Sequence, residues 1–155
     1  MPNCLVREVM SSPAIVIEWD ATILEAAALM ESHNIRRLPV VDEDGVLVGI
    51  ISTSDVREAT SVYSTASPYA PDQDEIILAV DEVMSSPVHT VSPDDRMLDV
   101  VRLMQTYKIG GIPVVDADDH VLGIVTESDV FQLLIQEWEK NEAASRAVEA
   151  GQAGC

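Results

Sequence analysis

Hydrophobic positions recur along the chain at two spacings, one typical of helices and one typical of short strands. Two sets at i, i+4, i+7 predict the core-facing stripes of amphipathic helices. These sets are Ile23, Ala27 and Met30, and then Met97, Val101 and Met104. Short runs rich in β-branched residues predict strands at 15–17, 38–42, 46–51, 88–91, 112–116 and 121–125. In chain order these elements alternate as β-α-β-β-α, twice.

The two halves of the chain form an internal repeat. Glu8–Val56 overlays Glu82–Val130 without a gap at an offset of 74 residues, and about 21 of the 49 pairs are identical. Each repeat begins with a short helical turn, which a proline ends because it disfavours helix in the residue before it. Asp20 and Asp94 precede the predicted helices and are expected to cap their free N–H groups. The sequence therefore predicts an α+β fold built from two β-α-β-β-α repeats.

The repeat sets the boundaries of four segments. These are a first repeat at 5–60, a linker at 61–80, a second repeat at 81–138 and a C-terminal tail at 139–155. Within the linker, Ser61–Gln73 holds Ser, Thr, Tyr and two Pro and predicts a mobile loop, whereas Asp74–Val80 predicts a short helix. Beyond Lys140 the only large apolar residue is Val148, so the last helix is expected to fray. Gly151–Cys155 is expected to be disordered.

Composition restricts the classes of protein that fit. Hydrophobic residues make up 47% of the 155 residues, which is enough for a core. No apolar run approaches the roughly 20 residues of a membrane span, and the N-terminus lacks a signal-peptide pattern. The two cysteines, Cys4 and Cys155, lie at the extremes and form no redox spacing, so we expect a cytoplasmic protein without a membrane partner. The formal net charge of −18 disfavours nucleic acid, whose binding depends on Lys and Arg.

One motif carries the candidate chemistry in both repeats. Gly49–Val56 and Gly123–Val130 each contain a glycine, two apolar residues, a hydroxyl residue, two polar residues, an aspartate and a valine. The pattern predicts a buried strand that runs directly into a helix, whose first N–H groups suit a phosphate or a polar sugar. A carboxylate there can accept hydrogen bonds from the two neighbouring hydroxyls of a ribose. The same residues also match a capping box, so both interpretations stay open.

Catalytic and metal-binding patterns are not evident in the sequence. The three histidines do not cluster, and no two soft ligands share a spacing that suits a metal ion. No nucleophile–base pair stands out, and no paired carboxylates stand out from the acidic background. We therefore expect no catalytic residue and no metal site.

Three duplicated motifs follow one another in each repeat. They are Met-Ser-Ser-Pro at 10–13 and 84–87, Pro-Val-Val-Asp at 39–42 and 113–116, and the glycine-to-aspartate motif above. In this order and spacing they resemble a tandem pair of cystathionine-β-synthase-type (CBS) domains over roughly residues 5–138. The likeness extends to stand-alone CBS-pair proteins of the acetoin-utilisation type. It implies two small sheets packed face to face about a pseudo-twofold axis, and two equivalent clefts for adenine-containing ligands.

The resemblance also implies the contacts that such a ligand would make. In the family the aspartate binds ribose, the hydroxyl lies near ribose or phosphate, and the backbone of the first strand reads the adenine edge. The candidate ligand-binding residues are Ser52 and Asp55, Thr126 and Asp129, Ala14, Ile15 and Val16, Val88, His89 and Thr90, and Ile112 and Pro113.

Two adjacent arginines, Arg36 and Arg37, occupy positions where relatives place phosphate-binding basic residues. Adjacent arginines are commonly solvated, but this chain holds few cations, so a phosphate-binding role is equally favoured. The second repeat has Gly110 and Gly111 instead, with Lys108 as the only nearby cation. In relatives such a basic pair reaches across the pseudo-twofold axis to the phosphates of the nucleotide whose ribose the other repeat holds. The resemblance therefore implies unequal clefts, in which a phosphorylated nucleotide occupies the cleft of Asp129 before that of Asp55.

Together these features predict a non-catalytic regulatory module that binds AMP, ADP or ATP. Two alternatives stay open: a structural dimerisation or interaction module without a ligand, and a binder of S-adenosylmethionine. The resemblance implies a flat homodimer through its helices, to which the last helix would add Phe131, Leu134 and Trp138, spaced i, i+3, i+7. A regulated partner protein is expected, and the sequence does not identify it.

Overall fold

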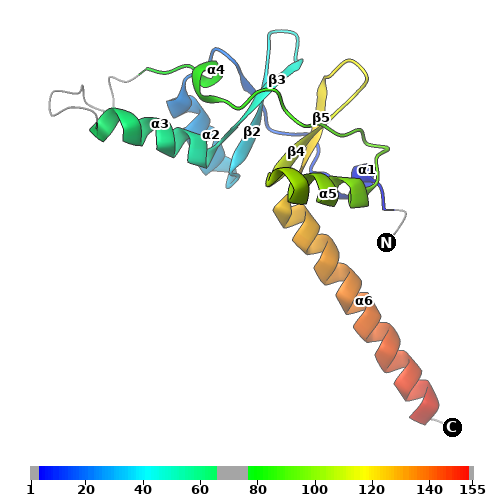
Figure 1. Cartoon of the computed structure of the whole chain (residues 1–155). Helices are drawn as coiled ribbons and strands as arrows, with labels where there is room; N and C mark the ends of the chain where they lie inside the picture. The colour runs from blue at the N-terminus through cyan, green and yellow to red at the C-terminus, as the bar shows by residue number, and fades with distance from the viewer. Residues whose placement is uncertain (1–3, 66–76, 154–155) are drawn as a thin grey trace.

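The computed structural model describes residues 4–65 and 77–153 (Figure 1). The first half contains α1 (Val6–Val9), β1 (Ile17–Glu18), α2 (Ile23–His33), β2 (Arg37–Val41), β3 (Leu47–Ser52) and α3 (Thr53–Thr65). The second half contains α4 (Val80–Val83), α5 (Met97–Tyr107), β4 (Gly111–Val115), β5 (Val121–Thr126) and α6 (Glu127–Ala153). The α+β class is confirmed, and the predicted order β-α-β-β-α is complete in the first repeat but lacks its first strand in the second.

The two hairpins have the same register. β2 pairs antiparallel with β3 so that Val40 faces Gly49, and β4 pairs with β5 so that Val114 faces Gly123. The hairpin ends also meet, because Val46 forms a bridge with His120 and the Leu47 N–H donates to the Asp119 carbonyl at 3.0 Å. The two hairpins are therefore joined at their loops by backbone contacts.

The first strand forms in only one repeat. β1 lies parallel to β2, and the Trp19 N–H extends the pairing by donating to the Val41 carbonyl at 3.0 Å. The predicted strand at 88–91 is wrong, because this segment forms only a single bridge, between Val91 and Val114. The offset places Pro93 opposite Trp19, and proline has no N–H with which to continue the ladder.

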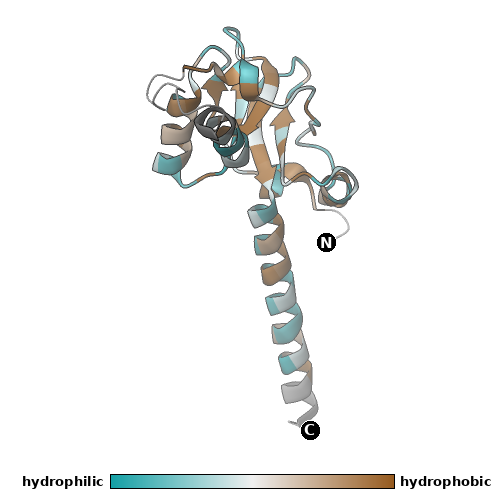
Figure 2. Cartoon of the chain, turned by 60° about the vertical axis from the view of Figure 1, so that its left-hand side comes forward, coloured by the Kyte–Doolittle hydropathy of each residue, from teal (hydrophilic) through white to brown (hydrophobic). Residues whose placement is uncertain are grey.

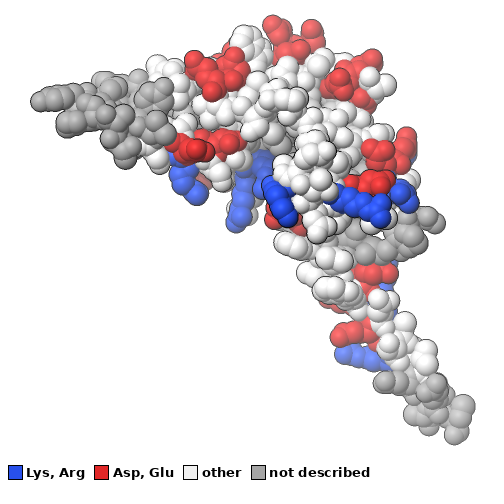
Figure 3. All heavy atoms as spheres, in the orientation of Figure 1, with Lys and Arg blue, Asp and Glu red and all other residues white. Residues whose placement is uncertain are grey.

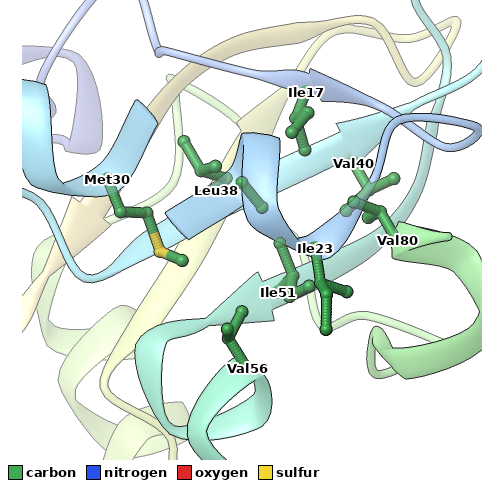
Figure 4. Close-up of a cluster of buried hydrophobic side chains, with 9 residues drawn as sticks. Ile17, Ile23, Met30, Leu38, Val40, Ile51, Val56 and Val80 are labelled. Atoms are coloured by element: carbon green, nitrogen blue, oxygen red, sulfur yellow. The ribbon is translucent and has the colours of Figure 1, made fainter. Parts of the chain in front are cut away.

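Each repeat completes the core of the other with its leading helix. Val80 of α4 is fully buried among residues of the first repeat, including Ile23, Val40 and Ile51 (Figure 4). Val6 of α1 is equally buried in the second core. Backbone bonds fix both crossings, since the Val80 N–H donates to Ala21 at 2.7 Å and the Val6 N–H donates to Asp95 at 2.9 Å. The spatial halves therefore differ from the sequence repeats by an exchange of these short helices.

The buried stripes of α2 and α5 are rotated slightly from the predicted ones. In α2 the buried side chains are Ile23, Ala26 and Met30, while Ala27 is half-buried. In α5 they are Met97 and Val100, and Val101 is exposed. The stripe thus follows i, i+3, which turns the other face outward. Apolar side chains remain on that outer face.

The predicted caps at Asp20 and Asp94 are wrong. Thr22 is the N-cap residue of α2, and its hydroxyl accepts the Glu25 N–H at 3.2 Å. The N-cap residue of α5 is Arg96, whose side chain makes no capping bond. The two aspartates lie two residues before these caps, too early to reach the free N–H groups of the first turn.

The linker and tail also differ from expectation. α3 continues to Thr65 and so includes the start of the predicted loop, while much of that loop lies outside the described residues. The helix predicted at 74–80 begins only at Val80, and Asp74–Ile76 is not described.

α6 is continuous to Ala153, so the predicted fraying beyond Lys140 is wrong. It projects away from the body, and beyond its first turns it is mainly hydrophilic or neutral (Figures 1 and 2). Among the described residues, no helix combines the length and apolar character needed to cross a membrane.

Candidate functional site

Both strand-to-helix junctions hold their aspartate by the same backbone bond. The Ser52 N–H donates to Oδ2 of Asp55 and the Thr126 N–H donates to Oδ2 of Asp129, each at 2.8 Å. In the first repeat the Ser52 hydroxyl also accepts the Asp55 N–H at 3.1 Å, which completes a capping box, whereas the Thr126 hydroxyl donates to Oδ2 of Asp129 at 3.3 Å. The capping interpretation is therefore correct for Ser52 and Asp55, and the second repeat keeps only the bond from the Thr126 N–H. Capping does not exclude a ligand: among the described residues no hydrogen bond reaches Oδ1 of Asp55, and Oδ1 of Asp129 accepts only Ser11 Oγ, at 3.5 Å.

The segment that enters each hairpin lies against the helix start of the same repeat. The Arg36 carbonyl accepts the Thr53 N–H at 2.9 Å, and the Gly110 carbonyl accepts the Glu127 N–H at 3.1 Å. These bonds fix the backbone before β2 and β4 beside the junctions. Residues 36–37 and 110–111 are consequently placed next to the candidate binding residues.

A cavity of about 830 Å³ opens at the junction of β3 and α3, and we call it the Asp55 cavity. Its polar wall contains Ser52, Thr53, Ser54 and Asp55. The lining cations are Arg36, Arg37, Arg57 and Lys108; the remaining lining residues are Ala27, Met30, Glu31, Asn34, Ile35, Ile50, Val56, Ser85, Ile109, Gly110 and Gly111. The cavity therefore combines an apolar floor with a polar, cationic rim.

A second cavity, of about 450 Å³, opens at the junction of β5 and α6, and we call it the Thr126 cavity. It is lined by Ser11, Pro13, Ala14, Ile15, Asn34, Ile35, Arg36, Arg37, Ile124, Thr126, Glu127, Ser128 and Phe131. Shifted by 74 positions, ten of these thirteen residues have a counterpart in the Asp55 cavity. The two cavities are therefore pseudo-symmetric mates whose linings differ at particular positions.

The predicted charge asymmetry is wrong in direction. The Arg pair lines the Thr126 cavity as expected, but it also lines the Asp55 cavity together with Arg57 and Lys108. The Thr126 cavity has Phe131 at the position of Arg57 and Glu127 at that of Thr53. The lining of the Asp55 cavity thus includes four cations and two carboxylates. The lining of the Thr126 cavity includes two cations and one carboxylate.

The Asp55 cavity concentrates cations in an acidic protein. Four of the nine Lys and Arg residues of the chain line it, although the net charge is −18. None of the four forms an ion pair with a described carboxylate, whereas Arg7, Arg96 and Arg146 each do. In Figure 3 the blue side chains gather below the level of the hairpins, while many Asp and Glu side chains lie along the upper edge. This arrangement favours an anionic ligand.

The predicted adenine contacts are divided among different places. Ala14 and Ile15 line the Thr126 cavity, whereas Val16 is 37% exposed outside it. Val88 and Thr90 line a separate cavity of about 350 Å³, next to the hairpin ends.

The remaining predicted contacts lie away from both main cavities. His89 stacks on Tyr107, with ring centroids 4.0 Å apart. Ile112 and Pro113 are buried within β4.

Arg57 and Phe131 are lining residues that the motif analysis did not assign. Each lies two residues after the aspartate of its motif and is the fifth residue of the following helix. Aligning the repeats beyond the valine would have identified both positions. It would not have revealed their surroundings, because those depend on how the other repeat packs against the helix.

The only group of His, Cys, Asp and Glu side chains in the described part that could hold a metal is at a hairpin turn. Ligand atoms of Asp116, Asp118 and His120 lie within 4.8 Å of one another. Oδ1 of Asp116 already accepts the N–H groups of Asp118 and His120 at 2.9 and 3.0 Å, and these bonds lower the pKa of Asp116. Asp42 makes the same two bonds in the other hairpin, so the group is explained as a repeated turn.

Comparison with known proteins identifies the repeats. The family model for the CBS domain matches residues 6–61 and 80–136. A CBS domain-containing protein of Dictyostelium discoideum is 35% identical over 138 residues, covering 85% of this chain and 92% of that protein. L-aspartate semialdehyde sulfurtransferase of Methanocaldococcus jannaschii is 36% identical, but the chain spans only 23% of its length. The match therefore concerns a small part of that enzyme.

Solved structures agree with the family model. The CBS domain pair of protein MJ0100, in complex with 5′-methylthioadenosine and S-adenosyl-L-methionine, is 35% identical, with a TM-score of 0.75 over 88% of this chain and 99% of that chain. A putative acetoin utilization protein from Vibrio cholerae is 29% identical, with a TM-score of 0.79 over 92% and 99%. This chain belongs to the CBS domain family and consists of a tandem pair of CBS repeats.

Proposed function

We propose that this CBS pair is a non-catalytic regulatory module that binds an adenine nucleotide in the Asp55 cavity. The observation that carries the proposal is the set of four cations without a described ion-pair partner, gathered beside an aspartate at a helix start. Bidentate bonds between arginine and phosphate are among the strongest that a protein can offer an anion. The volume of about 830 Å³ is also within the range of small-molecule sites.

In this proposal the two ends of the nucleotide meet different walls. The free Oδ1 of Asp55 accepts ribose hydroxyls, and the Ser52–Ser54 segment faces the sugar and phosphate. The guanidinium groups and Lys108 then lie around the phosphates. The apolar floor, which includes Met30 and Ile50, suits an adenine ring.

The Thr126 cavity suits a less charged adenosyl compound. It adds Phe131, Ala14 and Ile15 to the lining, and its two arginines are partly offset by Glu127. The MJ0100 pair was solved with methylthioadenosine and S-adenosylmethionine, which carry no phosphate. A ligand of this kind is the second half of the proposal.

A thermal-shift and calorimetry panel tests the function. AMP, ADP, ATP, S-adenosylmethionine and adenosine are titrated against the full chain. A nucleotide at one hundred times its dissociation constant should stabilise the protein by about 2.7 kcal/mol. No shift and no heat with any of the five would favour the alternative, a structural module without a ligand. A regulated partner and a cytoplasmic location stay predictions.

A homodimer is part of the proposal. The outward faces of α2 and α5 expose Leu24, Leu98 and Val101, and α6 exposes Phe131, Ile135 and Trp138. Exposed apolar side chains on neighbouring turns of a helix, such as those of α6, favour a protein interface. Light scattering at micromolar concentration should give twice the chain mass of 16.8 kDa. A monomer would contradict this part of the proposal and leave the ligand sites untouched.

A further inference from the structure

Arg36 and Arg37 line both cavities, although the cavities open at different junctions. The pair lies between the two repeats, where β2 begins. Its counterparts, Gly110 and Gly111, have no side chains. One pair of guanidinium groups therefore serves two potential anion sites.

The position of Arg37 depends on the two glycines opposite. A Cβ at Gly111 would lie 2.6 Å from Cδ of Arg37, and one at Gly110 would collide with both the Arg37 guanidinium and the Glu127 carboxylate. The Arg37 side chain therefore lies close to the backbone of residues 110–111, where the glycines leave space for it, and it lines both cavities. Glu127, from the wall of the Thr126 cavity, approaches the same place.

We propose that these shared arginines couple the two cavities, so that phosphorylated ligands bind them antagonistically; this inference rests on the proposed nucleotide binding. A planar guanidinium that makes bidentate bonds to a phosphate in one cavity cannot make them in the other. The Thr126 cavity has no other lining cation, so it loses its cationic contacts when the pair turns toward the Asp55 cavity. The second phosphate also enters a protein of formal charge −18.

The coupling has two consequences that follow from its origin. Because linkage is reciprocal, a phosphorylated ligand in either cavity weakens the other by the same factor, which for coupled sites is typically about 5- to 150-fold. Because the origin is competition for cations, an adenosyl ligand without a phosphate escapes it. The module would thus report the combination of one nucleotide and one uncharged adenosyl compound, and not two nucleotides.

Site-resolved NMR titration tests this coupling on the full chain. Ser54 lines only the Asp55 cavity and Ser128 only the Thr126 cavity, so the amide signals of these two residues are used to report each occupancy. AMP is titrated into the wild type and into Arg57→Ala/Lys108→Asn, which weakens only the Asp55 cavity. Asn is chosen because Asn34 occupies the same left-handed conformation in the first repeat, with φ 53° against 56° for Lys108. The affinity reported by Ser128 should rise about 5-fold or more in this variant.

Adenosine is the matched ligand, since it keeps the base and ribose and lacks the phosphate. Its affinity at Ser128 should be the same in both proteins. The Arg57→Ala/Lys108→Asn substitutions are also made in an Arg37→Ala background. There the AMP affinity reported by Ser128 should be no higher than in Arg37→Ala alone. An AMP affinity at Ser128 that is unchanged by the Arg57/Lys108 substitutions would overturn the coupling. Absence of any AMP response at both amides would instead overturn the proposed function.

Discussion

The two repeats share about 21 of 49 aligned residues, yet their cavities differ in size and charge. The identical residues build the parts that both need: the hairpin register, the Asp at the helix start and the turn residues. The repeats differ in the charged residues of the lining. Arg57 of the Asp55 cavity is equivalent to Phe131 of the Thr126 cavity, and Lys108 is equivalent to Asn34. Duplication has thus kept a frame that positions ligands while its rim residues changed.

A second difference is which repeat supplies the lining residues of each cavity. The Thr126 cavity takes Ala14 and Ile15 from the first repeat, but the Asp55 cavity does not take their counterparts, Val88 and His89. Packing of the His89 ring on Tyr107 keeps that side chain away. Pseudo-symmetry of the backbone therefore does not imply two equal sites.

The largest effect is expected from removing the cations that belong to the Asp55 cavity alone. Loss of charged hydrogen bonds costs about 1.5–3 kcal/mol each, so Arg57→Ala/Lys108→Asn should weaken AMP at that cavity about 100-fold. Calorimetry with AMP and adenosine measures it, and adenosine should change little. Arg102→Ala/Lys140→Ala is the charge-matched control, because it also removes two cations and neither residue lines either cavity. If AMP affinity fell equally in the variant and the control, the difference between the cavities would be an effect of net charge and not of the lining cations.

The next effect separates the two roles of the aspartates. Asp55→Ala should lower ligand affinity at the Asp55 cavity by about tenfold or more, whereas Asp129→Ala should change affinity at the Thr126 cavity less, because Asp129 is not among its lining residues. Each should also lower the free energy of unfolding by about 1 kcal/mol, because the carboxylate accepts the Ser52 or Thr126 N–H. Urea unfolding and calorimetry measure the two effects.

The asparagine variants provide the control for those aspartates. Asn keeps one acceptor oxygen for the backbone N–H but removes the charge. It should restore most of the stability and little of the affinity. If ligand affinity were restored together with stability, the negative charge of the carboxylates would not be needed for binding. The aspartates would then act only as helix caps, and other residues would bind the ligands.

A smaller effect comes from exchanging counterpart residues across the repeats. Glu127→Thr removes the carboxylate from the Thr126 cavity, and Thr53→Glu adds one to the Asp55 cavity. Interactions between exposed charges amount to about 0.2–1 kcal/mol, so AMP affinity should rise up to about fivefold in the first case and fall similarly in the second. NMR titration at Ser128 and Ser54 resolves the changes. Opposite signs would contradict the account of the charge difference.

The sequence was sufficient to predict most helices and strands, but not the packing of α1 and α4 into the core of the opposite repeat. Strand spacing and the offset of 74 predict both hairpins and both junctions, because these depend on local pattern. The crossing of α1 and α4 into each other's cores could not be predicted, since Val6 and Val80 would look equally buried in either core. The missing strand at 88–91 could have been predicted, because Pro93 cannot extend the ladder.

For the site, sequence identified the motif residues and the arginine pair but reversed the balance of the cavities. The resemblance implies that Arg36 and Arg37 serve one cleft, because in relatives such a pair reaches toward the nucleotide held by the other repeat. The structure places them between two cavities, and that depends on the empty space above Gly110 and Gly111. Such sharing is a property of packing between repeats, which no single motif contains.

The smallest effect compares the two hairpin turns. In the folded protein, the Asp116 carboxylate has its pKa held below the ordinary value near 3.8, chiefly by the His120 backbone N–H, with the Asp118 N–H and the imidazole adding to it against some desolvation. Because the folded pKa is the lower one, ionised Asp116 stabilises the protein fully above the unfolded pKa. That contribution is lost as the pH falls through the folded pKa.

Two variants of this turn separate the backbone from the imidazole. Asp116→Asn keeps the acceptor oxygen but cannot ionise, so its stability deficit should be present at pH 6 and shrink below about pH 3.8 in urea unfolding. His120→Val introduces the residue found at the same turn position in the first repeat, Val46, and keeps the backbone N–H. The pH dependence should largely survive, since the backbone bond is its main cause. If His120→Val removed it, the imidazole and not the turn would distinguish the second hairpin from the first.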